Sequence, residues 1–91
     1  MEFLVTLELS VQRVPEDRRE QLFRREAEVA TAFKRAGTIV RMWRLPGRTA
    51  TVSVWSVADA TELHERLGEL PLLPWMRVEV TALARHYVDD A

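Results

Sequence analysis

The chain has 91 residues, a formal net charge of −1 and a pI near 6.1. This length suits a single domain, which we place at residues 1–91, and leaves no room for a second. A nearly neutral chain lacks the strong positive field of electrostatic nucleic-acid binders, so we expect no nucleic-acid partner. The chain contains no cysteine, which excludes disulfides and thiolate metal sites.

No apolar run approaches the roughly 20 residues that a membrane-spanning helix needs. The first residues, 1–4, carry neither a basic region ahead of an apolar stretch nor a small-residue cleavage site. We therefore expect a cytoplasmic protein with no membrane partner. Because so short a chain buries only a thin core, and 47% of its residues are hydrophobic, we also expect it to self-associate.

Hydrophobic alternation and turn residues predict four strands and two helices. Apolar side chains alternate from residue 3 to 11, as is typical of a strand that buries one face. Pro15 and Gly37 mark the ends of a first helix, and the Pro46-Gly47 pair separates two strands as a hairpin turn. The expected ranges are strands at 3–11, about 39–45, about 49–57 and about 75–83, with helices at 15–36 and from 56–59 to about 70.

The resulting order β-α-β-β-α-β is that of the ferredoxin-like split βαβ pattern. Right-handed crossovers place both helices on the same face of a four-stranded antiparallel sheet, so the predicted fold class is α+β. The opposite face of the sheet is left uncovered. Trp43 and Trp55 lie on the two hairpin strands, which favours an apolar surface there that packs on a second subunit or lines a pocket.

Glu26 interrupts the apolar stripe of the first predicted helix. It lies four residues after Leu22, three after Phe23 and three before Val29. On a 3.6-residue period this spacing places a carboxylate within the core-facing stripe. Burial disfavours the charged form and raises the pKa, toward the range in which a carboxyl can act as general base and acid near neutral pH. The structural alternative is that Glu26 pairs with a buried arginine or reaches solvent at the edge of the stripe.

The remaining titratable groups are weaker candidates. His64 flanks the apolar stripe of the second helix, where a partly buried packing histidine is expected, and His86 lies in the polar tail. Neither has acidic partners at metal-ligand spacing, so we expect no metal site. Arg41 shares its predicted strand face with Ile39 and Trp43, which makes it a candidate anion clamp. Three arginines cluster around the hairpin: Arg41, Arg44 and Arg48.

Several short motifs follow one another in the second half of the chain. They are Met42-Trp43-Arg44-Leu45-Pro46-Gly47, Ser53-Val54-Trp55, Leu63-His64, Leu70-Pro71-Leu72-Leu73-Pro74-Trp75-Met76 and Arg85-His86. Together they resemble the muconolactone delta-isomerase family, which carries a Leu-Trp-Arg-x-x-Gly stretch, a Ser-Val-Phe strand, a Leu-His helix, a Leu-Pro-Leu-Phe-Pro-Tyr-Met connector and an Arg-His pair. The connector is the most specific of these motifs, because no generic secondary structure explains it.

The resemblance spans essentially the whole chain. It implies a ferredoxin-like fold of the dimeric α+β barrel type, in homo-oligomers (dimer to decamer) built from dimers that pack sheet on sheet. It also implies an isomerase of aromatic-compound catabolism that moves a proton between two carbons of a butenolide ring, without cofactor or metal. A first-helix glutamate is a proposed proton carrier in that family, and the gapless match back from Gly37 places it at Glu26.

The expected activity is therefore a proton shift on a small unsaturated lactone or related carbonyl compound, with Glu26 as the catalytic base. Arg41 or Arg44 would steady an anionic group, while Trp43 and Trp55 would form apolar pocket walls. Further expected substrate contacts, taken from the motifs that carry the resemblance, are Ser53, His64 and His86.

Several positions depart from the family. A His and a Lys of the first strand are replaced by Leu4 and Thr6, and a Tyr and an Asn of the hairpin by Thr49 and Thr51. These changes predict a less polar pocket, suited to a larger or less charged substrate than muconolactone. Two alternatives stay open at this point. One is a cofactor-free cyclase or monooxygenase acting on an aromatic polyketide-like compound, and the other is a non-catalytic binding or assembly module.

Overall fold

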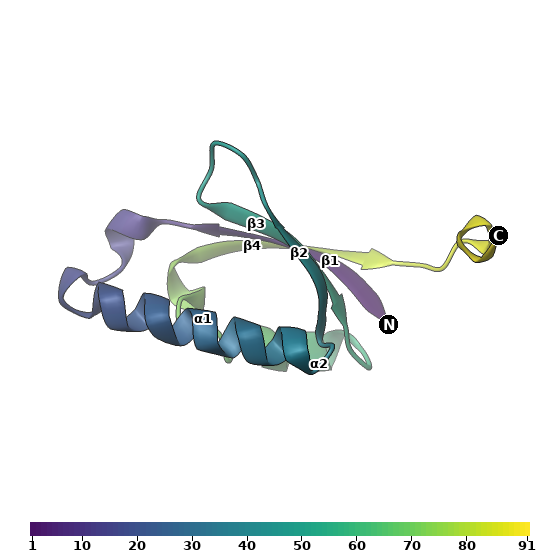
Figure 1. Cartoon of the computed structure of the whole chain (residues 1–91), viewed down its shortest axis with the longest axis horizontal. Helices are drawn as coiled ribbons and strands as arrows, with labels where there is room; N and C mark the ends of the chain where they lie inside the picture. Colours follow the sequence, from purple (N-terminus) through teal and green to yellow (C-terminus); the bar gives the residue numbers. More distant parts are fainter.

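The computed structural model describes residues 1–91 and has the predicted element order. Its strands form one antiparallel sheet in the order β2-β3-β1-β4, and both helices lie against the same face of it (Figure 1). The ferredoxin-like α+β prediction is thus confirmed for the single chain. The elements are β1 (Glu2–Leu9), α1 (Arg19–Arg35), β2 (Ile39–Arg44), β3 (Ala50–Ser56), α2 (Ala60–Leu67) and β4 (Met76–Leu83).

The element boundaries differ from the predicted ones mainly before α1. Strand β1 ends at Leu9, two residues early, and the chain passes through two short 3₁₀ turns, Val11–Arg13 and Glu16–Arg18, before the α-helix begins at Arg19. At the other helix, the side chain of Asp59 accepts a hydrogen bond from the N–H of Glu62 at 2.8 Å. This N-cap fixes the start of α2 within the predicted range.

The core lies between the helices and the covered face of the sheet. Trp55 is fully buried, and its ring meets that of Phe33 edge to face with a centroid distance of 5.5 Å. Its indole N–H donates to Ser53 Oγ at 2.8 Å, and the Ser53 hydroxyl donates to the carbonyl of Val5 at 3.3 Å. The buried polar atoms of this pair are therefore satisfied. The other core residues are Phe3, Leu7, Ile39, Val57, Leu63, Leu67 and Leu70.

A β-bulge at Val40 changes which side chains of β2 share a face. Ile39 pairs with Trp55 on β3, but the next paired residue of β2 is Arg41, opposite Val54. The inserted residue breaks the alternation, as bulges do. Arg41 therefore faces the uncovered side of the sheet, whereas Ile39 faces the core. The predicted face shared by Arg41 and Ile39 is wrong, while the one shared by Arg41 and Trp43 is confirmed by a cation–π contact of 5.1 Å.

The face of the sheet opposite the helices carries an apolar surface that no segment of this chain covers. Cross-strand pairing places Leu4 beside Val54, and Thr6 beside Val52 and Glu79. Trp43, opposite Val52, is 44% exposed. An apolar surface of this kind is typical of an interaction site.

The last residues leave the sheet and form a separate small unit. Beyond β4, a short 3₁₀ helix (Tyr87–Asp90) projects from the body of the molecule (Figure 1). Arg85 pairs with Asp90 at 2.7 Å, and the ring of His86 stacks on that of Tyr87, which is 81% exposed. The tail is thus held by contacts within itself. Neither of the two α-helices has the length and apolar character needed to cross a bilayer.

Candidate active site

A cavity of about 390 Å³ opens between α1 and the hairpin end of the sheet. Its walls combine the N-terminal half of α1 with the end of β1, the β2–β3 hairpin and the start of β4. Most of the lining is apolar, and the polar groups come from α1 and the hairpin. The lining residues are Leu7, Leu9, Phe23, Glu26, Ala27, Ala30, Met42, Arg44, Arg48, Thr49, Ala50, Thr51 and Met76.

Glu26 is the only carboxylate of the cavity wall. It lies on the inner face of α1, where the helical period places it between Phe23 and Ala30, and it is partly buried. No arginine, lysine or histidine of the chain pairs with it. The structural alternative, in which Glu26 is neutralised by a buried arginine, therefore does not hold within the subunit. A carboxylate at the wall of an open cavity is instead placed to meet a ligand.

One backbone group contacts this carboxylate. The N–H of Leu72 donates to Glu26 Oε1 at 3.0 Å, and no other hydrogen bond reaches either carboxylate oxygen. Burial raises the pKa of Glu26 above its ordinary value, and the Leu72 hydrogen bond opposes that rise. Burial is the larger effect, so the carboxyl group can exchange a proton closer to neutral pH than an exposed glutamate does.

Two arginines line the cavity, and only one of them is paired with a carboxylate of the chain. Arg48 donates from Nε and Nη2 to the Glu8 carboxylate, at 3.3 and 3.0 Å. Arg44, which shares a face of β2 with Met42, makes no ion pair within the chain. Arg44 is therefore the cation of this cavity that is free to bind an anionic group of a ligand.

Of the four positions expected to change the polarity of the pocket, only Thr49 and Thr51 line the cavity. The Thr49 hydroxyl donates to the carbonyl of Leu9 at 2.9 Å and closes the hairpin against β1. Leu4 and Thr6 belong to the opposite face of the sheet, because they alternate with the core residues of β1. The prediction that these two remove polar groups from the pocket is thus wrong for the cavity beside Glu26.

The structure separates the other expected substrate contacts from this cavity. Ser53 and Trp55 are buried core residues that bond to each other, and neither reaches the cavity. Trp43 and Arg41 stack on the uncovered face of the sheet. The β-bulge explains the position of Arg41. Ser53 and Trp55 point inward because they pair with Val5 and Phe3, which are core positions of β1.

Both histidines also lie away from the cavity. His64 flanks the buried stripe of Leu63 and Leu67 on α2 but is exposed, so the expected partial burial is wrong. His86 lies in the projecting tail, where its Nδ1 accepts from the N–H of Val88 at 3.1 Å. No group of three or more His, Asp or Glu side chains is arranged to hold a metal ion.

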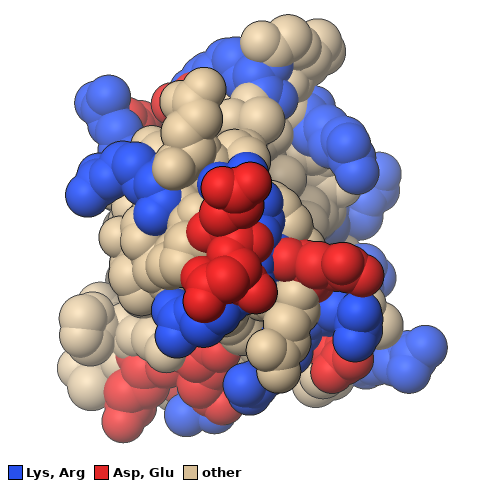
Figure 2. Space-filling model, turned by 90° about the vertical axis from the view of Figure 1, so that its left-hand side faces the viewer, with Lys and Arg blue, Asp and Glu red and all other residues tan.

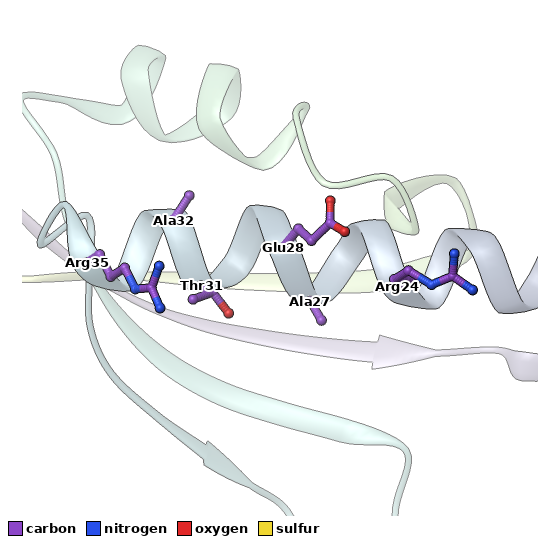
Figure 3. A pocket seen from close by; sticks show the side chains of 6 residues that line it. All are labelled: Arg24, Ala27, Glu28, Thr31, Ala32 and Arg35. Carbon is purple, nitrogen blue, oxygen red and sulfur yellow. The ribbon is translucent and has the colours of Figure 1, made fainter.

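A second depression lies on the outer side of α1. All of its lining residues come from that one helix, with Arg24 and Arg35 at its two ends and Glu28 between them (Figure 3). A surface formed by a single helix has no opposing wall to enclose a ligand.

Figure 2 shows acidic and basic side chains intermingled on the end of the molecule that carries the hairpin and the first turn of α1, so no field of one sign covers that end.

Several residues of the cavity are not predicted by the sequence patterns. The helical stripe predicts only a core position for Phe23, and Met76 enters only as the end of the connector motif. Met42 has no predicted role, although counting back in steps of two from the end of β2 places it on the same face as Arg44. Leu72 was recognised only as part of the specific connector. Its backbone contact with Glu26 gives that connector a physical role that the residue types alone do not reveal.

Comparison with known proteins gives a consistent result. A family model described as Muconolactone delta-isomerase matches residues 1–89. The chain is 34% identical over 82 residues to the Muconolactone Delta-isomerase of Pseudomonas aeruginosa, covering 90% of this chain and 84% of that protein. It is 34% identical over 71 residues to that of Rhodococcus opacus, covering 78% and 76%. A crystal structure of muconolactone isomerase matches with a TM-score of 0.84 and 36% identity, covering 96% of this chain and 92% of that one.

Proposed function

Because the chain belongs to the muconolactone delta-isomerase family, we propose that it isomerises an unsaturated lactone of the muconolactone type by a cofactor-free proton shift, with Glu26 as the proton carrier. The observation that carries the proposal is the open cavity with an unpaired, partly buried carboxylate in its wall. A cavity in this position, and the absence of a cation on Glu26, both support a chemical role over a purely structural one.

The reaction needs one group that is first a base and then an acid. The Glu26 carboxylate takes the proton from the ring carbon that bears the ring oxygen, and the electron pair moves through the double bond to give a dienolate. The protonated carboxyl then delivers the proton to the carbon beside the lactone carbonyl, and the double bond ends one position further along the ring. A raised pKa suits both steps, because efficient proton transfer needs a pKa near the working pH.

Arg44 supplies the positive charge that such a substrate requires. Muconolactone carries a free carboxylate, and a guanidinium binds a carboxylate through two parallel hydrogen bonds. Arg44 is available for this contact, whereas Arg48 is held by Glu8. The apolar lining of the cavity, which includes Phe23, Met42 and Met76, would pack on the ring. Arg44 therefore replaces Arg41 as the proposed anion clamp.

We propose further that the protein works as a homo-oligomer built from dimers, with the uncovered face of the sheet as the dimer contact. Support comes from the apolar side chains of that face, among them Trp43, Leu4 and Val54. His86 directly precedes the 3₁₀ helix Tyr87–Asp90, which projects from its own subunit (Figure 1). Any contact between His86 and substrate would therefore be made in the cavity of a second copy.

The proposal is tested by comparing Glu26→Gln with Glu28→Gln on muconolactone, following conversion of the lactone by NMR. Glutamine keeps the shape of the side chain and an oxygen to accept from the Leu72 N–H, but it cannot carry the proton. We expect the Glu26 variant to lose at least about 1,000-fold in kcat, within the range set by general acid–base catalysis. Glu28 is exposed on the outer side of the same helix, and its variant should match the wild type. Full activity in Glu26→Gln would refute the role of Glu26.

A further inference from the structure

The connector between α2 and β4, residues 70–75, has four backbone N–H donors, and two of them bond within the connector. The N–H of Leu73 donates to the carbonyl of Leu70 at 3.1 Å, and that of Trp75 to the carbonyl of Leu72 at 3.0 Å. Pro71 and Pro74 have no N–H to offer. The N–H of Leu70 donates to the carbonyl of Leu67 at the end of α2, at 3.1 Å. The N–H of Leu72 is the donor that reaches a distant segment, because it bonds Glu26 Oε1, 46 residues away in the sequence.

We propose that the Leu72 amide is a positioning group for the proton carrier: by holding Oε1 of Glu26, it presents Oε2 to the substrate. This inference rests on the proposed function. The two turn hydrogen bonds of the connector fix the direction of the Leu72 N–H, and the Leu72 side chain is buried. The donor is therefore held in place by both its backbone and its side chain. A glutamate side chain has three rotatable bonds, and without such an anchor its carboxylate would sample several positions in the cavity.

The contact also decides which oxygen carries the proton. A backbone N–H is only a donor, so the oxygen that faces it must remain an acceptor. When Glu26 is protonated, the hydrogen therefore resides on Oε2, the oxygen that has no partner in the chain. The same oxygen takes the proton from one ring carbon and returns it to the other. The carboxyl group then needs no rotation between the two steps.

The charges that face Glu26 are few. The hairpin contributes Arg44 and Arg48 to the cavity, while the connector, β1 and β4 contribute no titratable group to its lining. Arg48 is paired with Glu8. The pKa of Glu26 thus depends on burial, which raises it, and on the Leu72 hydrogen bond, which lowers it. Removing the hydrogen bond should raise the pKa of Glu26, since the bond favours the charged form.

A backbone ester provides the test, because it removes one N–H and keeps every side chain. In the full-length protein, the residue at Leu72 is replaced by its α-hydroxy analogue through nonsense suppression. The matched control carries the same change at Trp75, which also follows a proline and whose N–H bonds within the connector. The pKa of Glu26 is measured by NMR on protein labelled with ¹³C at the glutamate carboxyl carbons. The pH profile of kcat/KM is recorded on the same samples.

We expect the ester at position 72 to raise the pKa of Glu26 by about one unit and to move the acidic limb of the pH profile by the same amount. The ester at position 75 should lower stability while leaving that pKa at the wild-type value. An unchanged pKa in the first protein, or an equal rise in both, would overturn the inference. The NMR titration needs no substrate. A wild-type protein that converts no lactone would therefore overturn the proposed function, while the titration would still decide whether Leu72 holds Glu26.

Discussion

Arg48 bonds the Glu8 carboxylate through Nε and Nη2, at 3.3 and 3.0 Å, across 40 residues of sequence. The pair ties the hairpin that rims the cavity to β1, beside the Thr49 contacts with Leu9. It also pairs the charge of Arg48, which lines the cavity, with a carboxylate of the same chain. This ion pair thus holds the hairpin at the rim of the cavity, and it leaves Arg44 as the unpaired arginine of the lining.

Loss of this pair should loosen the hairpin. We expect Glu8→Gln to speed hydrogen exchange at the amides of Leu45 and Arg48, which close the turn. In the wild type, Arg48 holds the pKa of Glu8 below its usual value, so the stabilisation is present at neutral pH and is lost as the pH falls through that lowered pKa. Glu20→Gln, which breaks the exposed Arg24–Glu20 pair on α1, is the control. Unchanged exchange at the hairpin would contradict the prediction.

The charged Glu26 carboxylate should lower the free energy of unfolding at neutral pH. Its pKa is raised by folding, so the folded state disfavours the charged carboxylate, and this penalty develops as the pH rises through the unfolded and then the folded pKa. We expect Glu26→Gln to melt at a higher temperature than the wild type at pH 7, with the difference vanishing at pH 3. Thermal unfolding by circular dichroism measures this. An equal shift in the exposed Glu28→Gln would show that the effect is not one of burial.

Arg44 should govern the affinity for a carboxylate-bearing substrate. We expect Arg44→Met to raise KM for muconolactone by about 10- to 100-fold, since a hydrogen bond to a charged group contributes about 1.5–3 kcal/mol. KM for the methyl ester of the same lactone should change little. Arg41→Met removes a cation from the other face of the same strand and is the matched comparison. Steady-state kinetics with both substrates decide between the two arginines.

Trp55 should contribute to stability and leave substrate affinity unchanged. Trp55→Phe removes the indole donor to Ser53 and part of the packing on Phe33. The expected loss is about 1–3 kcal/mol in the free energy of unfolding, by urea titration. KM should stay at the wild-type value, because Trp55 does not line the cavity. A raised KM without loss of stability would instead place this residue at the substrate site.

The sequence predicted the fold and the key carboxylate because both depend on regular periods. Glu26 stands out from its helix by counting alone, and the split βαβ order follows from turn residues such as Pro46 and Gly47. The cavity itself was less predictable, since its lining depends on contacts between distant segments. Leu72 reaches Glu26 through a backbone atom that carries no sequence signal. Trp55, expected at a pocket wall, lies in the core, because an aromatic strand residue fits a core as well as a pocket wall.

The extra residue at Val40 has a consequence for how relatives of this chain are aligned. Because it occupies no position in the ladder with β3, a protein that lacked it would still place Arg41 opposite Val54 and Arg44 opposite Thr51. If residues are counted forward from Ile39, the alternation of side chains between the two faces of the sheet is shifted by one residue after the bulge. If they are counted back from the hairpin, each side chain is assigned to its correct face. Equivalent cavity residues are therefore best assigned from the turn backward, and a one-residue gap at this point leaves the binding surface intact.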